Sequence, residues 1–402
     1  MTTTQQSAAD YLAQISRKNT KQPRILFFDR EAFADNSKYL YLHMLKHYPQ
    51  FEIIWCSYTP GVINDLKRAG LPYHDINHAT PETLSLMLEA AIAIFCVNPW
   101  QSLGAQPIYA ACLEGAKHVQ LWHGVSVKHL QLSLISHLDM SEAGHILPMS
   151  WATRADYVLS TAPYFDAFWA KTFGCQQLLR GAFPRNEVIT RTPMPEEMTG
   201  AMLPPAAQQA MQQPGRKIFL APTWQRNKAT SLTSSSFMLK LMRYALHHDI
   251  NVFVKTHPYH KGDNVFASGK VANLHSLPME LDIYPWLNHF DVLITDYSSI
   301  MFDYLLTGKP VLTLDIPAGK HHNFEPDYRL VPGNDNWRYR FTPDNLVEVL
   351  HSALHQDDKQ FARQEMLAQI FACDSSQANA DLAYKVVKML EERCQSPQLQ
   401  VF

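Results

Sequence analysis

Short apolar runs alternate with stretches of helical periodicity along most of this chain. In the first half the apolar runs, which predict β-strands, cover residues 24–29, 52–57, 92–98, 118–124 and 157–162. Between them, apolar positions three and four residues apart predict helices over 36–48, 62–69, 81–91, 107–116 and 164–173. Strands that alternate with helices in this way are typical of a parallel sheet with helices on both faces.

A segment rich in proline and glutamine, residues 191–215, interrupts the alternation and predicts a linker. A second series follows, with strands over 217–222, 251–257, 292–296 and 310–315, and helices near 236–248, 282–289, 298–307, 343–355, 358–372 and 376–393. We therefore expect an α/β fold of two doubly wound, Rossmann-like domains that face a cleft. The expected parts are an extension over 1–23, a first domain over 24–190, the linker, a second domain over 216–375, and a final helix within 376–402.

The amino-terminal extension has an apolar stripe at helical spacing, followed by basic residues at positions 17, 18, 21 and 24. Two interpretations stay open, namely a short membrane-surface helix with a basic tail, or a segment that docks on the protein itself or frays. No apolar run approaches the ~20 residues that a membrane span needs, and the polar start shows no signal peptide.

Composition and missing motifs exclude several classes of protein. The formal net charge of −2 draws the protein toward neither nucleic acid nor anionic lipid. The six cysteines are scattered without a CxxC pair, which favours reduced thiols in a cytoplasmic protein and argues against a zinc site. The chain lacks a Walker loop, GxGxxG and GxSxG, so a P-loop NTPase, a dinucleotide oxidoreductase and a serine hydrolase have no support.

One stretch, residues 293–312, reads as strand, tight turn, helix, turn and strand. Ser298 and Ser299 fall where the helix begins, where free N–H groups, hydroxyls and the helix dipole suit a phosphate. Asp296 ends the strand, where open α/β sheets bind ligands. The structural alternative is an ordinary helix cap after an ordinary strand.

Two histidines also follow predicted strands. His123 ends an apolar run and precedes Gly124, while His257 ends a β-branched run and precedes Pro258. Histidine can take a proton near neutral pH or bind phosphate as a cation. Either one alone is equally well a structural histidine of a turn. With one in each half of the chain, the two predict opposite walls of a cleft.

These segments resemble a known family. The motifs WHG, APTW, KTHP and TDYSSIMFDY, in this order, are similar to the CDP-glycerol glycerophosphotransferases of teichoic acid and capsule synthesis, and DNSKYLY and FPRNE also resemble the family. The resemblance covers roughly residues 24–390. After WHG, where the family has Thr-Pro-Leu-Lys, only Lys128 matches, and Gln225 displaces the family's arginine by one place. The resemblance implies the glycosyltransferase-B architecture, with nucleotide on the second domain and a last helix that returns to the first.

It also implies a reaction, in which an acceptor hydroxyl attacks the β-phosphate of CDP-glycerol, or of a related CDP-polyol, and CMP leaves. His123 is then the candidate base, and His257 binds the diphosphate. The remaining donor-side residues are Thr223, Arg226, Lys255, Asp296, Ser298, Ser299 and Asp303, and the acceptor side has Gly124, Lys128, Asn36 and Lys38. Arg226, Lys255 and Asp303 could equally be solvated surface residues. No cofactor is required, although Asp296 could hold a divalent cation such as Mg²⁺.

The expected acceptor is lipid-linked or an oligosaccharide, which places the protein peripherally at the cytoplasmic membrane face, without nucleic acid and with a homo-oligomer left open. A nucleotide-sugar glycosyltransferase of the same architecture is the alternative enzyme. A non-catalytic nucleotide-binding scaffold is the alternative of a different class.

Overall fold

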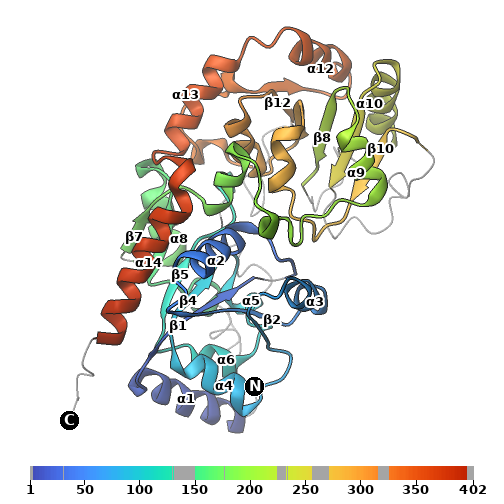
Figure 1. The fold of residues 1–402 in the computed structure, drawn as a ribbon. Helices are drawn as coiled ribbons and strands as arrows, with labels where there is room; N and C mark the ends of the chain where they lie inside the picture. Colours follow the sequence, from blue (N-terminus) through green and yellow to red (C-terminus); the bar gives the residue numbers. More distant parts are fainter. Residues whose placement is uncertain are drawn as a thin grey trace.

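The computed structural model describes residues 3–29, 31–128, 130, 150–175, 177–223, 232, 234–255, 271–315 and 326–395, with side chains from residue 8 onward. A first parallel sheet consists of β1 Gln22–Phe28, β2 Glu52–Ser57, β3 Tyr73–Asp75, β4 Ala90–Phe95, β5 Lys117–Gln120, β6 Tyr157–Ser160 and β7 Gln177–Arg180. Its strand order is β3-β2-β1-β4-β5-β6-β7. It forms the lower lobe in Figure 1.

A second parallel sheet forms the upper lobe in Figure 1. It consists of β8 Lys217–Ala221, β9 Asn251–Lys255, β10 Leu274–Leu277, β11 Val292–Thr295, β12 Val311–Leu314 and β13 Tyr339–Phe341, in the order β10-β9-β8-β11-β12-β13. Both orders reverse beside the first strand of the sheet, which is the doubly wound pattern. The expected fold of two Rossmann-like domains is therefore confirmed.

The helices cover both sheets. The first lobe has α1 Thr3–Lys18, α2 Asp35–His47, α3 Pro60–Ala69, α4 Pro81–Glu89, α5 Pro99–Ser102, α6 Pro107–Cys112 and α8 Asp166–Phe173. The remainder are α9 Pro205–Gln212, α10 Ser235–His247, α11 Ile300–Asp303, α12 Leu346–His355, α13 Gln360–Ile370 and α14 Ala378–Gln395. Two predicted helices are tighter than expected, since 3₁₀ helices occupy Tyr284–His289 and Tyr304–Thr307. The predicted linker contains α9.

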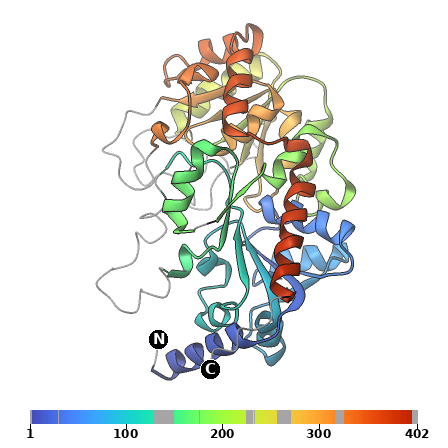
Figure 2. The same ribbon diagram turned by 90° about the vertical axis from the view of Figure 1, so that its left-hand side faces the viewer.

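The last helix, α14, leaves the second lobe and runs along the first, as both views show (Figures 1 and 2). Near its start, Asn379 Nδ2 donates to the Pro184 carbonyl at 3.0 Å. Near its end, Arg393 donates to the Gly115 carbonyl at 2.8 Å. The helix therefore braces the first lobe over most of its length.

Helix α1 docks on the first lobe. The Ser16 hydroxyl donates to the Cys112 carbonyl at 2.5 Å, and Arg17 pairs with Glu114 at 3.1 Å. Lys21 is buried, and its ammonium donates to the Leu88 carbonyl at 2.6 Å. Because these contacts use the protein's own groups, they favour the docked interpretation over a basic membrane tail. Among the described residues, none of the helices has the length and apolar character of a membrane span.

A buried histidine in the first sheet predicts acid sensitivity. Burial, assisted by Arg154, lowers the pKa of His118 to about 4, and its Nε2 bonds the Leu113 carbonyl at 2.9 Å. In the unfolded chain the pKa of this histidine returns to about 6.5. Between about pH 6.5 and pH 4 the unfolded chain therefore binds a proton that the folded protein does not, and acid favours unfolding. Between pH 7 and pH 5 the protein should lose about 2 kcal/mol of folding free energy through this group. Urea midpoints at the two pH values measure it.

The control for this prediction is a pair of variants. His118→Gln removes the titration and should reduce the loss between pH 7 and pH 5, whereas His78→Gln alters an exposed histidine and should not. An equal acid loss in both variants would contradict the assignment to His118.

Candidate active site at the seam between the lobes

The chain leaves β5 through a strained turn. Trp122 has a left-handed backbone conformation with φ of 54°, which costs roughly 1–3 kcal/mol for a residue other than glycine. Two buried amides hold it. Gln120 Oε1 accepts from the Trp122 N–H at 2.8 Å, and Asn36 Nδ2 donates to the Trp122 carbonyl at 2.6 Å. The strained conformation therefore presents the next side chain in a defined direction.

That next side chain is His123, whose ring is oriented by a backbone contact. Nδ1 lies 3.2 Å from the carbonyl oxygen of Cys96, just after β4. Because a carbonyl oxygen can only accept, this contact favours the tautomer with the hydrogen on Nδ1, whose neutral form has its lone pair on Nε2. The ring also lies against Trp122, with centroids 4.3 Å apart. This arrangement suits a general base acting through Nε2.

Gly124 is where the two lobes meet. Its φ of 130° is a conformation that favours glycine, and a Cβ there would lie 2.8 Å from Ser299 Oγ and 2.9 Å from Arg185 Nη2. The Ser299 hydroxyl also reaches the His123 carbonyl at 3.5 Å. The structure thus brings the WHG segment of the first lobe against the DYSS segment of the second.

Asp296 is buried at the switch point of the second sheet, between the loops that follow β8 and β11. Its Oδ1 accepts from the Tyr297 N–H at 2.7 Å and from the Thr223 N–H at 3.0 Å. The Thr223 hydroxyl donates to the same carboxylate. Thr223, predicted to bind phosphate, therefore directs both of its donors to Asp296, and Asp296 holds the two loops together.

Ser298 and Ser299 remain partly exposed at the start of α11. The α-helix that follows spans only Ile300–Asp303 before it tightens, so its dipole is weaker than the sequence suggested. A phosphate at this turn would be held mainly by hydroxyl and N–H donors.

Two predicted cations lie in buried surroundings, one in each lobe, and Lys128 is the one beside the turn. The Lys128 ammonium lies 4.6 Å from the centroid of the Tyr297 ring, and burial lowers its pKa to about 8, opposed by Asp296. Lys255 ends β9, and burial lowers its pKa too, opposed by Asp282 and Asp35. Both are therefore partly desolvated charges, which attract an anion more strongly than solvated ones.

Two predicted acceptor-side residues have other tasks. Lys38 is fully buried, and its ammonium donates to the Glu197 and Thr199 carbonyls and to Asp282, at 2.6, 2.8 and 2.7 Å. An ammonium has three hydrogens, so none is left for an acceptor molecule. Asn36 is equally buried and holds the Trp122 turn. We correct both predictions: these residues join protein segments.

Asp303, predicted on the donor side, is also buried, and it pairs with an arginine that sequence reasoning missed. Arg185 Nη2 lies 2.6 Å from Asp303, and Nη1 lies 2.6 Å from Asp35. Burial alone would lower the pKa of Arg185, but the two carboxylates outweigh it and raise that pKa. Burial raises the pKa of Asp303, which Arg185 opposes. The segments that contain Arg185 and Asp35, FPRNE and DNSK, were both noted as family-like in the sequence. Neither segment indicated that it contacts the other.

Other predictions stay open. His257 and Arg226 lie outside the described residues. Within the part of the chain that the structure describes, no three His, Cys, Asp or Glu side chains are placed to hold a metal ion.

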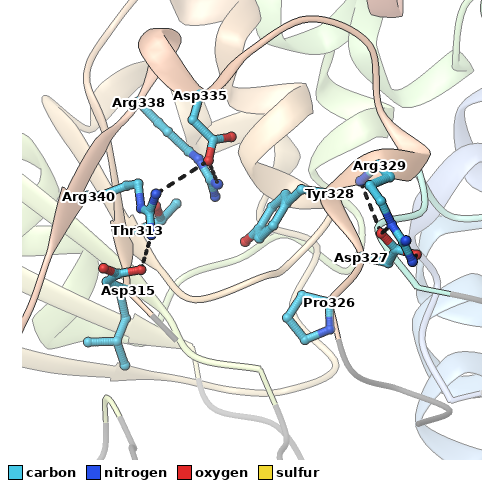
Figure 3. A pocket seen from close by; sticks show the side chains of 10 residues that line it. Thr313, Asp315, Pro326, Asp327, Tyr328, Arg329, Asp335, Arg338 and Arg340 are labelled. Atoms are coloured by element: carbon cyan, nitrogen blue, oxygen red, sulfur yellow. Dashed lines mark hydrogen bonds and ion pairs between the residues drawn. The ribbon is translucent and has the colours of Figure 1, made fainter. Parts of the chain in front are cut away.

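A pocket of about 280 Å³ opens beside the end of β12 in the second lobe (Figure 3). The Arg338 guanidinium lies 3.9 Å from the centroid of the Tyr328 ring and pairs with Asp335 at 2.8 Å. Arg340 pairs with Asp315 on the same side. The Tyr328 hydroxyl donates to the Asp296 carbonyl at 3.4 Å, so the pocket wall continues into the DYSS turn.

Comparison with known sequences finds one family over nearly the whole chain. Residues 11–388 match the family model for CDP-glycerol:poly(glycerophosphate) glycerophosphotransferase. The teichoic acid poly(glycerol phosphate) polymerase of Staphylococcus epidermidis is 25% identical over 314 residues, which are 73% of this chain and 40% of that protein. The teichoic acid glycerol-phosphate transferase of Staphylococcus aureus is 21% identical over 319 residues, 75% of this chain and 77% of that protein. The chain thus spans well under half of the first relative.

Solved structures show the same fold. The wall teichoic acid polymerase TagF, soaked with CDPG, superposes with a TM-score of 0.71 at 20% identity, covering 98% of this chain and 95% of that chain. The MnaA–UDP structure from S. aureus superposes with a TM-score of 0.56 at 10% identity, covering 93% and 98%.

Proposed function

Because the chain belongs to the CDP-glycerol:poly(glycerophosphate) glycerophosphotransferase family, we propose that it transfers glycerol phosphate from CDP-glycerol to a hydroxyl of a teichoic-acid-like or capsular acceptor. CMP is the second product. The acceptor is a growing polymer or a lipid-linked chain that the enzyme meets at the cytoplasmic membrane face. The observation that carries the proposal is the meeting of His123 with the Ser298–Ser299 turn across the seam, supported by the 3.5 Å contact of Ser299 with the His123 carbonyl.

The proposed reaction needs one proton transfer and one substitution at phosphorus. His123 Nε2 takes the proton of the acceptor hydroxyl, whose oxygen forms a bond to the β-phosphorus. The bond from that phosphorus to the oxygen bridging to the α-phosphate breaks, and CMP leaves with the electron pair. Ser298, Ser299 and Lys128 hold the phosphate oxygens, where fixed donors favour the charge that develops.

The pocket at Tyr328 supports a nucleotide on the second lobe. An aromatic ring can stack with a pyrimidine, and one guanidinium group can donate to two phosphate oxygens at once. Because Tyr328 contacts the Asp296 backbone, a nucleotide there would place its diphosphate toward Ser298. Open α/β sheets bind ligands at the carboxyl ends of their strands, where this pocket lies.

The test incubates the protein with CDP-glycerol and a lipid-linked or oligosaccharide acceptor, and follows CMP release and acceptor mass. Parallel reactions contain CDP-ribitol, a UDP-sugar or a GDP-sugar. The proposal expects CMP and an acceptor heavier by one or more glycerol phosphate units. Turnover of a nucleotide sugar alone would instead support a glycosyltransferase, and nucleotide binding without turnover would support a scaffold.

A half-buried lysine predicts a pH dependence of donor binding. Lys128 loses its charge as pH rises through about 8, so CDP should bind more weakly at pH 9 than at pH 7. Lys128→Arg keeps the charge and should bind CDP equally at both values. Lys128→Met should weaken binding about 10-fold at pH 7, the equivalent of one charge-assisted hydrogen bond. Calorimetry measures each dissociation constant, and a wild-type affinity that is constant from pH 7 to 9 would remove Lys128 from the phosphate site.

A further inference from the structure

We infer that Arg185 is a positioning residue that sets the orientation and tautomer of His123, and that it does so when Asp303 of the second lobe is docked against it. The part of this inference that concerns turnover rests on the proposed function. The part that concerns the imidazole does not.

The guanidinium of Arg185 joins three groups from distant parts of the chain. Its side chain is 2% exposed, and it lies 2.6 Å from Asp35 and 2.6 Å from Asp303. Nη2 also donates to the carbonyl of His123 at 2.9 Å. A planar guanidinium holds its donors in a fixed fork, so the positions of the two carboxylates determine where the third hydrogen bond points.

Arg185 controls the peptide groups on both sides of the His123 α-carbon. It binds the His123 carbonyl directly. Its backbone N–H donates to Asn36 Oδ1 at 3.3 Å, and the other end of that amide donates to the Trp122 carbonyl at 2.6 Å. With both flanking peptides held, Nδ1 of the ring lies 3.2 Å from the Cys96 carbonyl oxygen, a contact that favours the hydrogen on Nδ1.

The backbone conformation shows that this turn needs external support. Among the described residues, four other than glycine have positive φ, and two of them adjoin the network: Asp35 at 64° and Trp122 at 54°. Such conformations persist where surrounding contacts hold them, and they occur often at functional sites. Arg185 contacts one directly and the other through Asn36.

The contact from the second lobe makes the arrangement conditional on docking. Asp303 Oδ2 accepts from Arg185 and from the Tyr284 hydroxyl at 2.9 Å, and the guanidinium lies 4.5 Å from the Tyr284 ring centroid. Without these second-lobe groups, Asp35 would be the one carboxylate left against Arg185 among the described residues. The candidate base is therefore aligned when the lobes are closed on each other.

A second buried ion pair provides the matched control. Lys38 and Asp282 are 0% exposed, lie 2.7 Å apart and also join the first lobe to segments on the far side of the seam. The Asp282 carboxylate accepts hydrogen bonds from the Lys38 ammonium, the Tyr39 hydroxyl and the Tyr284 N–H, and none of these donors belongs to the His123 turn. Asp282→Asn should therefore loosen the seam without releasing the imidazole.

The experiment records two-bond ¹H–¹⁵N spectra of histidine-labelled protein without substrate. The His123 signals are assigned by their loss in His123→Asn. We expect the Nδ1–H tautomer in the unaltered protein and in Asp282→Asn, and a mixture of tautomers in Arg185→Lys and Asp303→Asn. The other histidine signals report whether each variant is folded, and if Arg185→Lys does not fold, Asp303→Asn decides alone.

Two results would overturn the inference. One is a pure Nδ1–H tautomer in every folded seam variant. The other is an equal change in Asp282→Asn, which would assign the effect to general loosening of the lobes.

Kinetics provide the second readout. Arg185→Lys and Asp303→Asn should lower kcat about 10²-fold, the usual cost of a misplaced catalytic group, with the KM for CDP-glycerol within about three-fold. Asp282→Asn should keep kcat within about three-fold. If the unaltered protein turns over no CDP-glycerol, the proposed function fails, whereas the tautomer result still accepts or rejects the role of Arg185.

Discussion

A His123→Asn variant is expected to transfer glycerol phosphate about 10²–10⁴-fold more slowly than the unaltered protein, while its affinity for CDP-glycerol changes by less than about three-fold. The asparagine amide can replace Nδ1 as the donor to the Cys96 carbonyl, which now lies 3.2 Å from the ring. The turn is then preserved, but nothing stands at Nε2 to take a proton. The loss therefore falls on the chemical step.

Single-turnover CMP release measures this rate, and calorimetry measures the affinity. His123→Ala removes the contact with Cys96 as well and should be at least as slow. Turnover by His123→Asn near the unaltered rate would remove His123 from the mechanism and leave it a structural histidine beside Trp122.

The largest expected effect on stability comes from Lys38→Met, which should lower the free energy of unfolding by about 3–5 kcal/mol. The substitution removes the ammonium that lies 2.7 Å from Asp282, and both side chains are 0% exposed. Asp282 would then be a buried carboxylate with hydrogen bonds from Tyr39 and the Tyr284 N–H but no cation directly against it. Urea unfolding followed by tryptophan fluorescence measures the change.

Two further variants make the measurement specific. Lys46→Met, on the same helix, removes an ammonium that lies 3.9 Å from Glu196 on a side chain that is 55% exposed, and it should cost less than about 1 kcal/mol. Adding Asp282→Asn to Lys38→Met should recover part of the loss, because the unpaired charge is removed. A Lys38→Met variant as stable as Lys46→Met would show that the pair does not stabilise the seam.

The central strands of both sheets could be predicted from the sequence alone. Strands such as β4 and β8 are covered by helices on both faces, so they read as continuous apolar runs. The four strands that the pattern missed are β3, β7, β10 and β13, the two edges of each sheet. An edge strand has a neighbour on one side only, and these are short and partly exposed, so their residues carry a weaker local signal.

Short-range sequence patterns also identified candidate residues in the motifs. A histidine after a strand, or a serine pair before a helix, is a short-range pattern, and it placed His123 and Ser299 on facing segments. Local patterns failed for Lys38 and Thr223, whose donors go to partners far along the chain. The residues near Lys38 and Thr223 in the sequence do not indicate that their donors are used by groups of the protein itself.

By itself, then, the sequence determined two doubly wound domains and the residue types on which the proposed phosphate transfer rests, because burial of strands and turn chemistry act over a few neighbouring positions. The tertiary structure alone decided which charged groups are buried in ion pairs that join the lobes. Arg185 and Asp303 are 118 residues apart and Lys38 and Asp282 are 244 apart, yet each pair is buried in contact. A buried charge requires a partner in space rather than in sequence, and only the docking of the two lobes provides it.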